Sequence, residues 1–211
     1  MGGGRLAENN KEGLTTGGAF YAMLSRMKYI NRWGLMRSTR PENISEHSLD
    51  TAVIAHALAL LRNQRFGGHV DPSRVALLAL FHDAAEIITG DMPTPVKYHS
   101  PALREAYREV EAAAQDRLLA MLPEDLRPAY EPLLCPDEAE APLWRLVKAA
   151  DKISALIKCM EEKNMGNLEF EQAQVSLRRA IAEMELPEAD CFVRQFLPAY
   201  GLTLDEQGAT F

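Results

Sequence analysis

The feature that most constrains the fold is an apolar run that follows Asp71-Pro72 and carries three ionisable side chains near its end. Aspartate is a good helix N-cap and proline suits the first helical position, so the run predicts one buried helix over residues 71–90. In such a helix His82 and Asp83 both lie one turn before Glu86. Ionisable groups in apolar surroundings cost several kcal/mol unless each is paired or binds a metal, so this helix end is a candidate site. A core histidine beside a surface aspartate is the plainer alternative, and the rest of the chain has to decide.

The rest of the sequence also predicts helices. Apolar residues recur at helical spacing in further segments, over residues 19–33, 45–64, 101–122, 137–166, 168–184 and 187–200. Ser45 is the expected N-cap of the second helix. No segment alternates apolar and polar residues as a half-buried strand does, and no turn pair joins two apolar runs as in a hairpin. We therefore predict an all-α fold, a single helical bundle of six or more helices.

Glycine and proline mark the connections between these helices. Residues 1–18 hold six of the thirteen glycines, so we expect a disordered leader that takes no part in chemistry. The folded domain should then span residues 19–205, with a polar tail over 206–211. Two prolines predict an extended loop over residues 91–95, and the proline-rich segment 123–136 should be irregular, with one short turn at most.

The overall charge and the cysteines exclude several classes of protein. With a net charge of −7 and a pI near 5.3, the chain lacks the basic face that a nucleic-acid polymer needs. No stretch approaches the roughly 20 apolar residues that span a bilayer. The cysteines are odd in number and widely spaced, which indicates reduced thiols. We expect a cytoplasmic protein that binds neither a nucleic-acid polymer nor a membrane.

Four polar residues stand on otherwise apolar helical faces and come from three predicted helices. They are His47 in the first turn of the second helix, His82 and Asp83, and Asp151 in the middle of the helix over 137–166. Two imidazoles and two carboxylates form a mixed nitrogen and oxygen set that suits a borderline divalent ion. Four protein ligands leave further positions open for water, which is typical of a catalytic metal.

The same pattern, a histidine, then His-Asp, then a distant aspartate, resembles that of the HD-domain metal-dependent phosphohydrolases, an all-helical superfamily. The sequence around this pattern gives a more specific likeness. From residue 19 to about residue 205 it is similar to the sequences of the bacterial 5′-deoxynucleotidases. The segments that carry the likeness are Ile30-Asn31-Arg32-Trp33, Glu42-Asn43-Ile44-Ser45-Glu46-His47-Ser48, Phe66-Gly67-Gly68, His82-Asp83-Ala84-Ala85-Glu86, Thr89-Gly90-Asp91-Met92-Pro93-Thr94-Pro95-Val96-Lys97 and Ala150-Asp151.

The resemblance implies an activity and a set of roles. The family removes the 5′-phosphate from deoxyribonucleoside monophosphates and works as a homodimer, and it prefers the deoxy over the ribo sugar. Carried over by motif, His47, His82, Asp83 and Asp151 would bind one divalent metal, with Co²⁺ or Mn²⁺ favoured over Zn²⁺, Fe²⁺ or Cu²⁺. The residues implied to bind the substrate are Arg32 at the phosphate, Trp33 where a 2′-hydroxyl would sit, Asp83 and Asp151 at the metal, and the loop Asp91, Met92, Pro93 and Thr94.

Physical chemistry agrees with these roles and adds one more. The guanidinium of Arg32 can direct two donors at two phosphate oxygens. Glu86, one turn beyond Asp83, is close enough to move a proton as a general acid or base. Three further histidines lack partners at ligand spacing and should be structural or surface residues, namely His56, His69 and His99.

Two other functions remain open at this point. The chain can be an HD phosphohydrolase that acts on another nucleotide, such as a triphosphate or a signalling nucleotide. It can also be a non-catalytic helical module that keeps its metal for stability. Glu86 and Arg32 discriminate against the second alternative, because a purely structural metal needs neither.

Overall fold

The computed structural model describes residues 18–97 and 99–208, and apart from one isolated bridge between Asn31 and Asn43 its regular elements there are all helices. This confirms the all-α prediction. None of these helices is long and apolar enough to cross a bilayer. The α-helices are α2 (Phe20–Leu24), α3 (Ile44–Arg65), α4 (Pro72–Phe81), α5 (Glu86–Thr89), α6 (Thr94–Lys97), α7 (Pro101–Leu119), α8 (Arg127–Leu134), α9 (Ala141–Asn164), α10 (Glu171–Ala182) and α11 (Pro187–Gln195).

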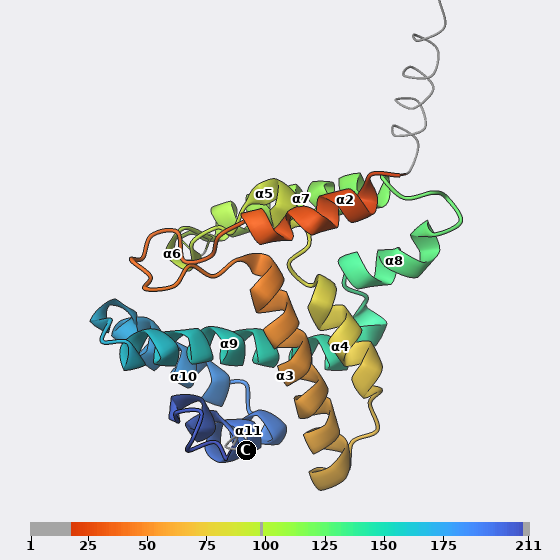
Figure 1. Cartoon of the computed structure of the whole chain (residues 1–211). Helices are drawn as coiled ribbons and strands as arrows, with labels where there is room; N and C mark the ends of the chain where they lie inside the picture. The colour runs from red at the N-terminus through yellow and green to blue at the C-terminus, as the bar shows by residue number, and fades with distance from the viewer. Residues whose placement is uncertain (1–17, 98, 209–211) are drawn as a thin grey trace, which may run out of the picture.

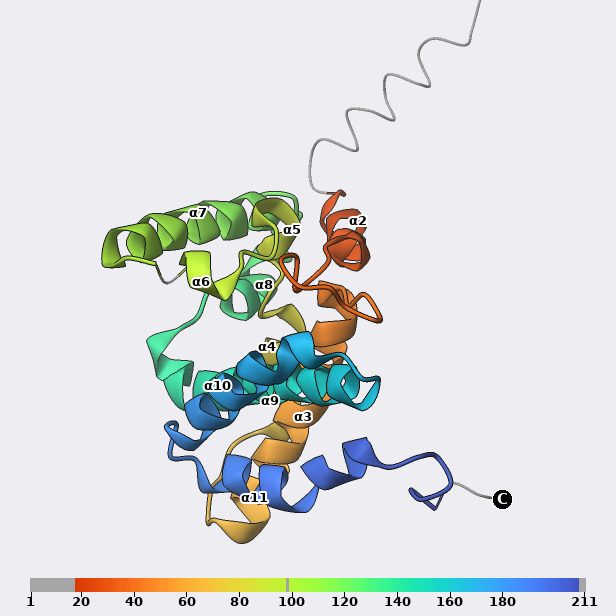
Figure 2. The ribbon, with the colours of Figure 1, turned by 90° about the vertical axis from the view of Figure 1, so that its left-hand side faces the viewer.

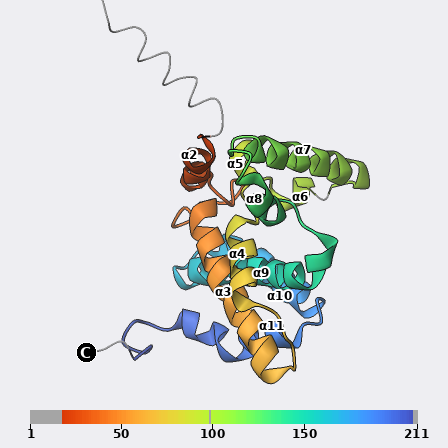
Figure 3. The same cartoon turned by 90° about the vertical axis from the view of Figure 1, so that its right-hand side faces the viewer.

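The helices form two tiers. In Figure 1 the long helices α3 and α9 cross at the centre, with α4 beside α3 and with α10 and α11 at the far end from α7. Figures 2 and 3 show that α2, α5, α6 and α7 lie together above this bundle. The main core lies between α3, α4, α9 and α11, and its fully buried members include Leu58, Leu78, Leu146 and Leu156.

The prediction of one helix over residues 71–90 is wrong in one respect, because the structure has two helices there. Asp71 caps α4 as expected, and its carboxylate accepts a hydrogen bond from Ser73 N. The chain then leaves the α-helix at His82 and makes a tight turn over residues 82–85 before α5 begins at Glu86. The backbone bonds of this turn join residues three apart, as from Glu86 N to Asp83 O at 3.0 Å. The turn therefore passes the chain from the lower tier to the upper tier.

Both ends of the second helix also differ from the prediction. Asn43, not Ser45, is the N-cap of α3, and its side chain accepts hydrogen bonds from the two backbone amides of Ser45 and Glu46. The helix runs on to Arg65. The first predicted helix is shorter than expected, since α2 continues only as a 3-10 helix, η1 (Ser25–Tyr29). Residues 30–43 therefore form a loop that leads into α3.

The proline-rich segments are more helical than predicted. The loop expected over residues 91–95 leads into α6, and the segment 123–136 contains α8, because proline is tolerated in a first helical turn. The helix predicted from Asp137 begins there as a 3-10 turn, η2 (Glu138–Glu140), before α9. Two further 3-10 helices are η3 (Leu168–Phe170) before α10 and η4 (Leu197–Gly201) after α11.

The ends of the chain bear on the predicted domain limits. Residues 1–17 of the expected leader and 209–211 of the expected tail lie outside the described residues. The leader therefore stays a prediction, as does the domain span over residues 19–205.

Candidate active site

The structure brings together three of the predicted metal ligands where the two tiers meet. His47 comes from the first turn of α3 and is fully buried, and His82 and Asp83 come from the turn between α4 and α5. Asp83 Oδ2 lies 3.1 Å from His82 Nε2 and 3.6 Å from His47 Nε2. One potential ligand atom from each residue lies within 4.8 Å of the others, so the three can hold a metal ion.

The fourth predicted ligand, Asp151, lies at the edge of this cluster. It comes from the middle of α9, and its Oδ1 is 3.1 Å from His47 Nε2. Its side chain is more exposed than that of Asp83, at 37% against 22%. The four residues therefore share one location, with Asp151 on the side that is open to solvent.

The hydrogen bonds of the two histidines fit a cation. His82 Nδ1 lies 2.7 Å from the carbonyl oxygen of Ala79, so this nitrogen donates and leaves a lone pair on Nε2. Nε2 is buried without a hydrogen-bond partner and faces the carboxylate of Asp83. An unprotonated Nε2 and a carboxylate oxygen at this distance are two acceptors in contact, and they repel each other unless a proton or a metal ion lies between them. Although burial opposes it, Asp83 raises the pKa of His82, which also shows that the site favours positive charge.

A residue that the sequence reasoning missed orients the other imidazole. Ser154 Oγ lies 3.1 Å from His47 Nδ1, one turn of α9 beyond Asp151. With this hydroxyl at Nδ1, Nε2 is the nitrogen that points at both carboxylates. The i, i+3 spacing from Asp151 was the one sequence signal that could have indicated Ser154.

Glu86 stands beside this cluster as the first residue of α5. One of its carboxylate oxygens, Oε2, is buried and has no hydrogen-bond partner. Burial, and then the charges of Asp83 and Asp91, raise the pKa of Glu86 from 4.5 to about 9. In the metal-free protein this carboxyl group therefore holds a proton at neutral pH.

This raised pKa predicts how the stability of the metal-free protein depends on pH. Because the folded state holds the Glu86 proton more tightly than the unfolded chain, its contribution to stability is lost as pH rises from about 5 towards 9. The slope is at most about 1.4 kcal/mol per pH unit. Urea unfolding of the wild type and Glu86→Gln at pH 6 and pH 8, both with chelator, measures it. We expect a smaller loss in the variant, and equal losses would contradict the assignment.

Arg32 and Trp33 lie next to the cluster in the loop over residues 30–43. The guanidinium of Arg32 is largely buried, with Nη1 4.0 Å from Asp83 Oδ2 and Nε 3.4 Å from Glu42 Oε2. Neither nitrogen makes a hydrogen bond. Nε faces Glu42 and Nη1 faces Asp83, so Nη1 is the donor available to an anion placed beside Asp83.

Trp33 is held in an unusual backbone conformation with a φ of 60°, which is costly for an aromatic residue. Its backbone N–H donates to Asp91 Oδ2 at 3.3 Å, and its indole Nε1 donates to Glu42 Oε2 at 2.9 Å. Glu42 is thus a second residue without an assigned role in the sequence analysis, since nothing in its spacing marked it. Held from two sides, the indole has a fixed orientation beside Arg32.

The other predicted site residues are less closely tied to the cluster. Met92 and Pro93 are half-buried and Thr94 is exposed at the start of α6, all directly after Asp91. Of the substrate loop, only Asp91 makes a hydrogen bond to the residues around the cluster among the contacts of the described chain. Three histidines are exposed and away from the cluster, as predicted: His56, His69 and His99.

Comparison with known proteins identifies the family. The family model of the YfbR-like 5′-deoxynucleotidases matches residues 19–200. The chain belongs to this family. A 5′-deoxynucleotidase from Vibrio vulnificus is 48% identical over 187 residues, which cover 89% of this chain and 96% of the relative. One from Erwinia tasmaniensis is also 48% identical, over 89% of this chain and 94% of the relative.

Solved structures agree with the fold of a YfbR-like protein. An HD-domain phosphohydrolase from Listeria innocua superposes with a TM-score of 0.75 at 26% identity, and the match covers 90% of each chain. This confirms the resemblance to the HD-domain phosphohydrolases.

Proposed function

We propose that this YfbR-like chain hydrolyses deoxyribonucleoside 5′-monophosphates to a deoxyribonucleoside and phosphate. The observation that carries the proposal is the His82 Nε2 without a hydrogen-bond partner among carboxylates, with Arg32 Nη1, a donor that is also without one, beside Asp83. A nitrogen and oxygen set for a cation beside a guanidinium suits a phosphomonoester. The relatives at 48% identity support the same activity.

His47, His82, Asp83 and Asp151 would hold one divalent ion. When bound, such an ion supplies Lewis-acid activation of water and neutralises charge on the phosphoryl group. We propose Co²⁺ or Mn²⁺ ahead of Zn²⁺, Fe²⁺ or Cu²⁺, an order that the family resemblance implies, since a set of two imidazoles and two carboxylates suits any borderline divalent ion.

Arg32 and Glu86 would act on the two ends of the scissile bond. The guanidinium of Arg32 would donate from Nη1 to a phosphate oxygen and so orient the phosphorus. Glu86 Oε2 would donate its proton to the departing 5′-oxygen of the sugar, since this oxygen is buried beside the cluster without a hydrogen-bond partner. Asp91, Met92, Pro93 and Thr94 would hold the nucleoside, with Asp91 fixed by its bond to Trp33 N.

Trp33 would set the preference for the deoxy sugar by filling the space of a 2′-hydroxyl. We expect Trp33→Ala to narrow the ratio of kcat/KM between dAMP and AMP, by up to about 10²-fold, because steric exclusion of one hydroxyl is worth no more than that. Initial rates with both nucleotides measure the ratio. A ratio that stays at the wild-type value would remove Trp33 from this role.

A substrate panel tests the proposed activity against the other phosphohydrolase functions. Hydrolysis of dAMP, AMP, dATP and 2′-deoxyadenosine 3′-monophosphate, followed as release of phosphate, pyrophosphate or triphosphate, should be fastest with dAMP. Preference for dATP would favour a triphosphohydrolase instead. No release from any of the four would favour the non-catalytic metal module.

We further propose that the chain is a homodimer that pairs through α3. Its outer face carries three apolar side chains in one stripe, Leu49, Val53 and Leu60, which are 58%, 62% and 41% exposed. A two-fold axis that pairs α3 antiparallel with its copy would bring the two stripes together. Light scattering of the purified chain measures the mass.

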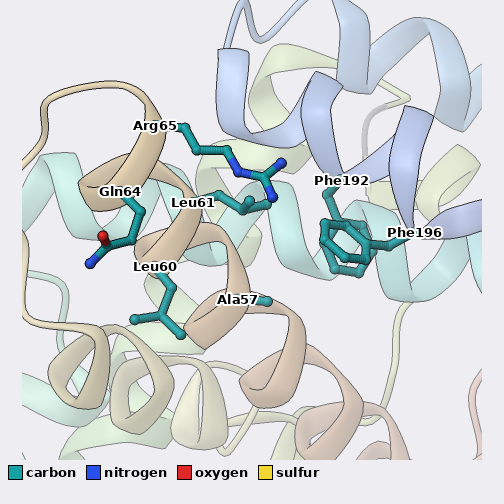
Figure 4. Close-up of a pocket in the computed structure, with 7 residues that line it drawn as sticks. All are labelled: Ala57, Leu60, Leu61, Gln64, Arg65, Phe192 and Phe196. Atoms are coloured by element: carbon teal, nitrogen blue, oxygen red, sulfur yellow. The ribbon is translucent and has the colours of Figure 1, made fainter.

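A hollow beside this stripe supports the pairing face. It has a volume of about 260 Å³ and lies between the second half of α3 and α11, with Phe192 and Phe196 on one wall and Leu60 and Leu61 on the other (Figure 4). Ala57, where the hollow begins, lies ten residues beyond His47, or about 15 Å along the helix. The hollow is therefore separate from the metal cluster, and we assign it to the protein contact.

We propose the cytoplasm as the compartment of the enzyme. The three cysteines, all within the described residues, are free thiols, and Cys159 and Cys191 are buried. Free thiols persist where the surroundings are reducing.

A further inference from the structure

The loop that carries Arg32 and Trp33 is closed at its base. Arg32 N donates to the carbonyl oxygen of Glu42 at 2.8 Å, and Ile44 N donates to that of Ile30 at 3.0 Å. Between these bonds the chain makes a turn over residues 33–36, closed by Met36 N donating to the carbonyl oxygen of Trp33 at 2.8 Å, bends at residues 39–40 and returns to α3. The base alone does not fix the direction of the loop, because its bonds join only neighbouring ends of the same segment.

The tip of the loop is bound to the C-terminal end of α9 by a buried ion pair. Lys158 and Glu162 are 4% and 1% exposed, and the ammonium of Lys158 donates to the carboxylate of Glu162. Glu162 Oε2 accepts from both the backbone N–H and the hydroxyl of Thr39, each at 2.8 Å. Lys158 Nζ also donates to the carbonyl oxygen of Arg40 at 2.6 Å. Both charges of the pair therefore contact the loop.

The charge state of Glu162 agrees with this arrangement. Although burial opposes it, Lys158, the Thr39 donors and Asn167 lower the pKa of Glu162 to about 2. Asn167 Nδ2 donates to Glu162 Oε2 at 2.8 Å and to the carbonyl oxygen of Arg37 at 2.7 Å. Buried ion pairs bring little net stability compared with apolar residues of the same volume, so such a pair is better explained by the geometry that it fixes.

The ion pair lies on the same helix as two groups of the metal cluster. Asp151, Ser154, Lys158 and Glu162 follow one another on α9 at intervals of three or four residues, so they share one face. At the end of this face, Phe170 of η3 packs edge-on against Trp33 with ring centroids 5.2 Å apart. One rigid helix thus contacts both the metal cluster and the loop that bears Arg32 and Trp33.

We propose that the Lys158–Glu162 pair is a latch that fixes residues 31–43 against α9, and that both are positioning residues for the phosphate and sugar contacts of Arg32 and Trp33. The proposal rests on the proposed function. The latch does not touch the metal ligands, so it should act on substrate binding and sugar selectivity and leave metal binding unchanged.

Glu162→Gln tests the latch, and Glu188→Gln is its matched control. Glu188 is also 1% exposed and pairs with an arginine, since Arg62 Nη1 lies 2.9 Å from its Oε1, but this pair joins α3 to α11 away from the loop. For Glu162→Gln we expect KM for dAMP to rise by about tenfold, with a smaller change in kcat and a lower ratio of dAMP to AMP hydrolysis. Co²⁺ affinity should match the wild type. Glu188→Gln should change neither KM nor the ratio.

Limited digestion with trypsin gives a readout that needs no substrate. Cleavage after Arg37, at the tip of the loop, should be faster in Glu162→Gln than in the wild type and in Glu188→Gln. If the wild-type protein hydrolysed no nucleotide, the proposed function would fail, but the digestion rates would still show whether the ion pair holds the loop. Equal digestion of the two variants, or an unchanged KM and ratio in an active Glu162→Gln, would overturn the proposal.

A milder variant covers the case in which Glu162→Gln does not fold. Thr39→Val removes one hydroxyl donor to Glu162 from an exposed position and keeps the backbone donor. It should shift KM and the digestion rate in the same direction by a smaller factor. Wild-type values for both in Thr39→Val would contradict the latch.

Discussion

Asp83→Ala is expected to abolish metal binding and turnover together. Among the described residues, Asp83 is the one whose carboxylate contacts both histidines of the cluster, at 3.1 Å and 3.6 Å. Without it, the two imidazoles and the more exposed Asp151 remain, and a divalent ion loses its central charged ligand. Titration with Co²⁺ should show no tight site, and phosphate release from dAMP should fall to the level of the metal-free wild type.

Asp190→Ala is the matched control for this variant. Asp190 is an exposed aspartate on α11, in the lower tier and away from the cluster. It should bind Co²⁺ and hydrolyse dAMP as the wild type does. Full activity in Asp83→Ala would refute the assignment of this residue as a ligand.

Glu86→Gln should separate catalysis from binding. The substitution keeps the size of the side chain but removes the group that transfers a proton, so hydrolysis of dAMP should slow by a factor of about 10² or more. Because the carboxyl group is neutral in the metal-free protein, its replacement by a neutral amide should leave the affinity for Co²⁺ nearly unchanged. Single-turnover rates at saturating dAMP, with Co²⁺ titrations alongside, measure the two effects.

The control for Glu86→Gln is Glu109→Gln, at an exposed position on α7. Its rate should equal that of the wild type. Should Glu86→Gln retain the wild-type rate, Glu86 would be only a buried neighbour of the ligands. Should it lose metal binding as well, it would belong to the ligand set.

The periodicity of apolar residues predicted both the helices and three of the clustered side chains. His47, His82 and Asp83 are visible in the sequence because each breaks an apolar pattern that a packed helix would otherwise complete. The structure places their ligand atoms together, although they come from two different segments of the chain.

The break between α4 and α5 could not be predicted from local sequence. The residues from His82 to Glu86 contain neither glycine nor proline, so nothing nearby signals an end. Tertiary packing causes it: Ala84 packs into a cluster with Phe20 and Leu118, and Ile87 packs into another with Met27. These partners lie far away in the chain, and a straight helix would have carried both residues past them.

The polar contacts of the loop over residues 31–43 could not be predicted from the sequence either. Lys158 and Glu162 follow the i, i+4 pattern of an ordinary surface ion pair, so their burial depends on a loop more than a hundred residues earlier. Glu42 likewise lies in a polar segment that predicts only a connection. Such roles depend on long-range hydrogen bonds, which leave no period in the sequence.

One measurement tests the central claim most directly, that four side chains from α3, α9 and the turn between α4 and α5 bind a divalent ion that hydrolysis requires. The wild type is stripped with chelator, reloaded with single ions, and assayed for phosphate release from dAMP while the bound ion is counted. We predict no release from the stripped protein and recovery on binding one Co²⁺ or Mn²⁺ per chain. Full hydrolysis by protein that retains no metal would contradict the account.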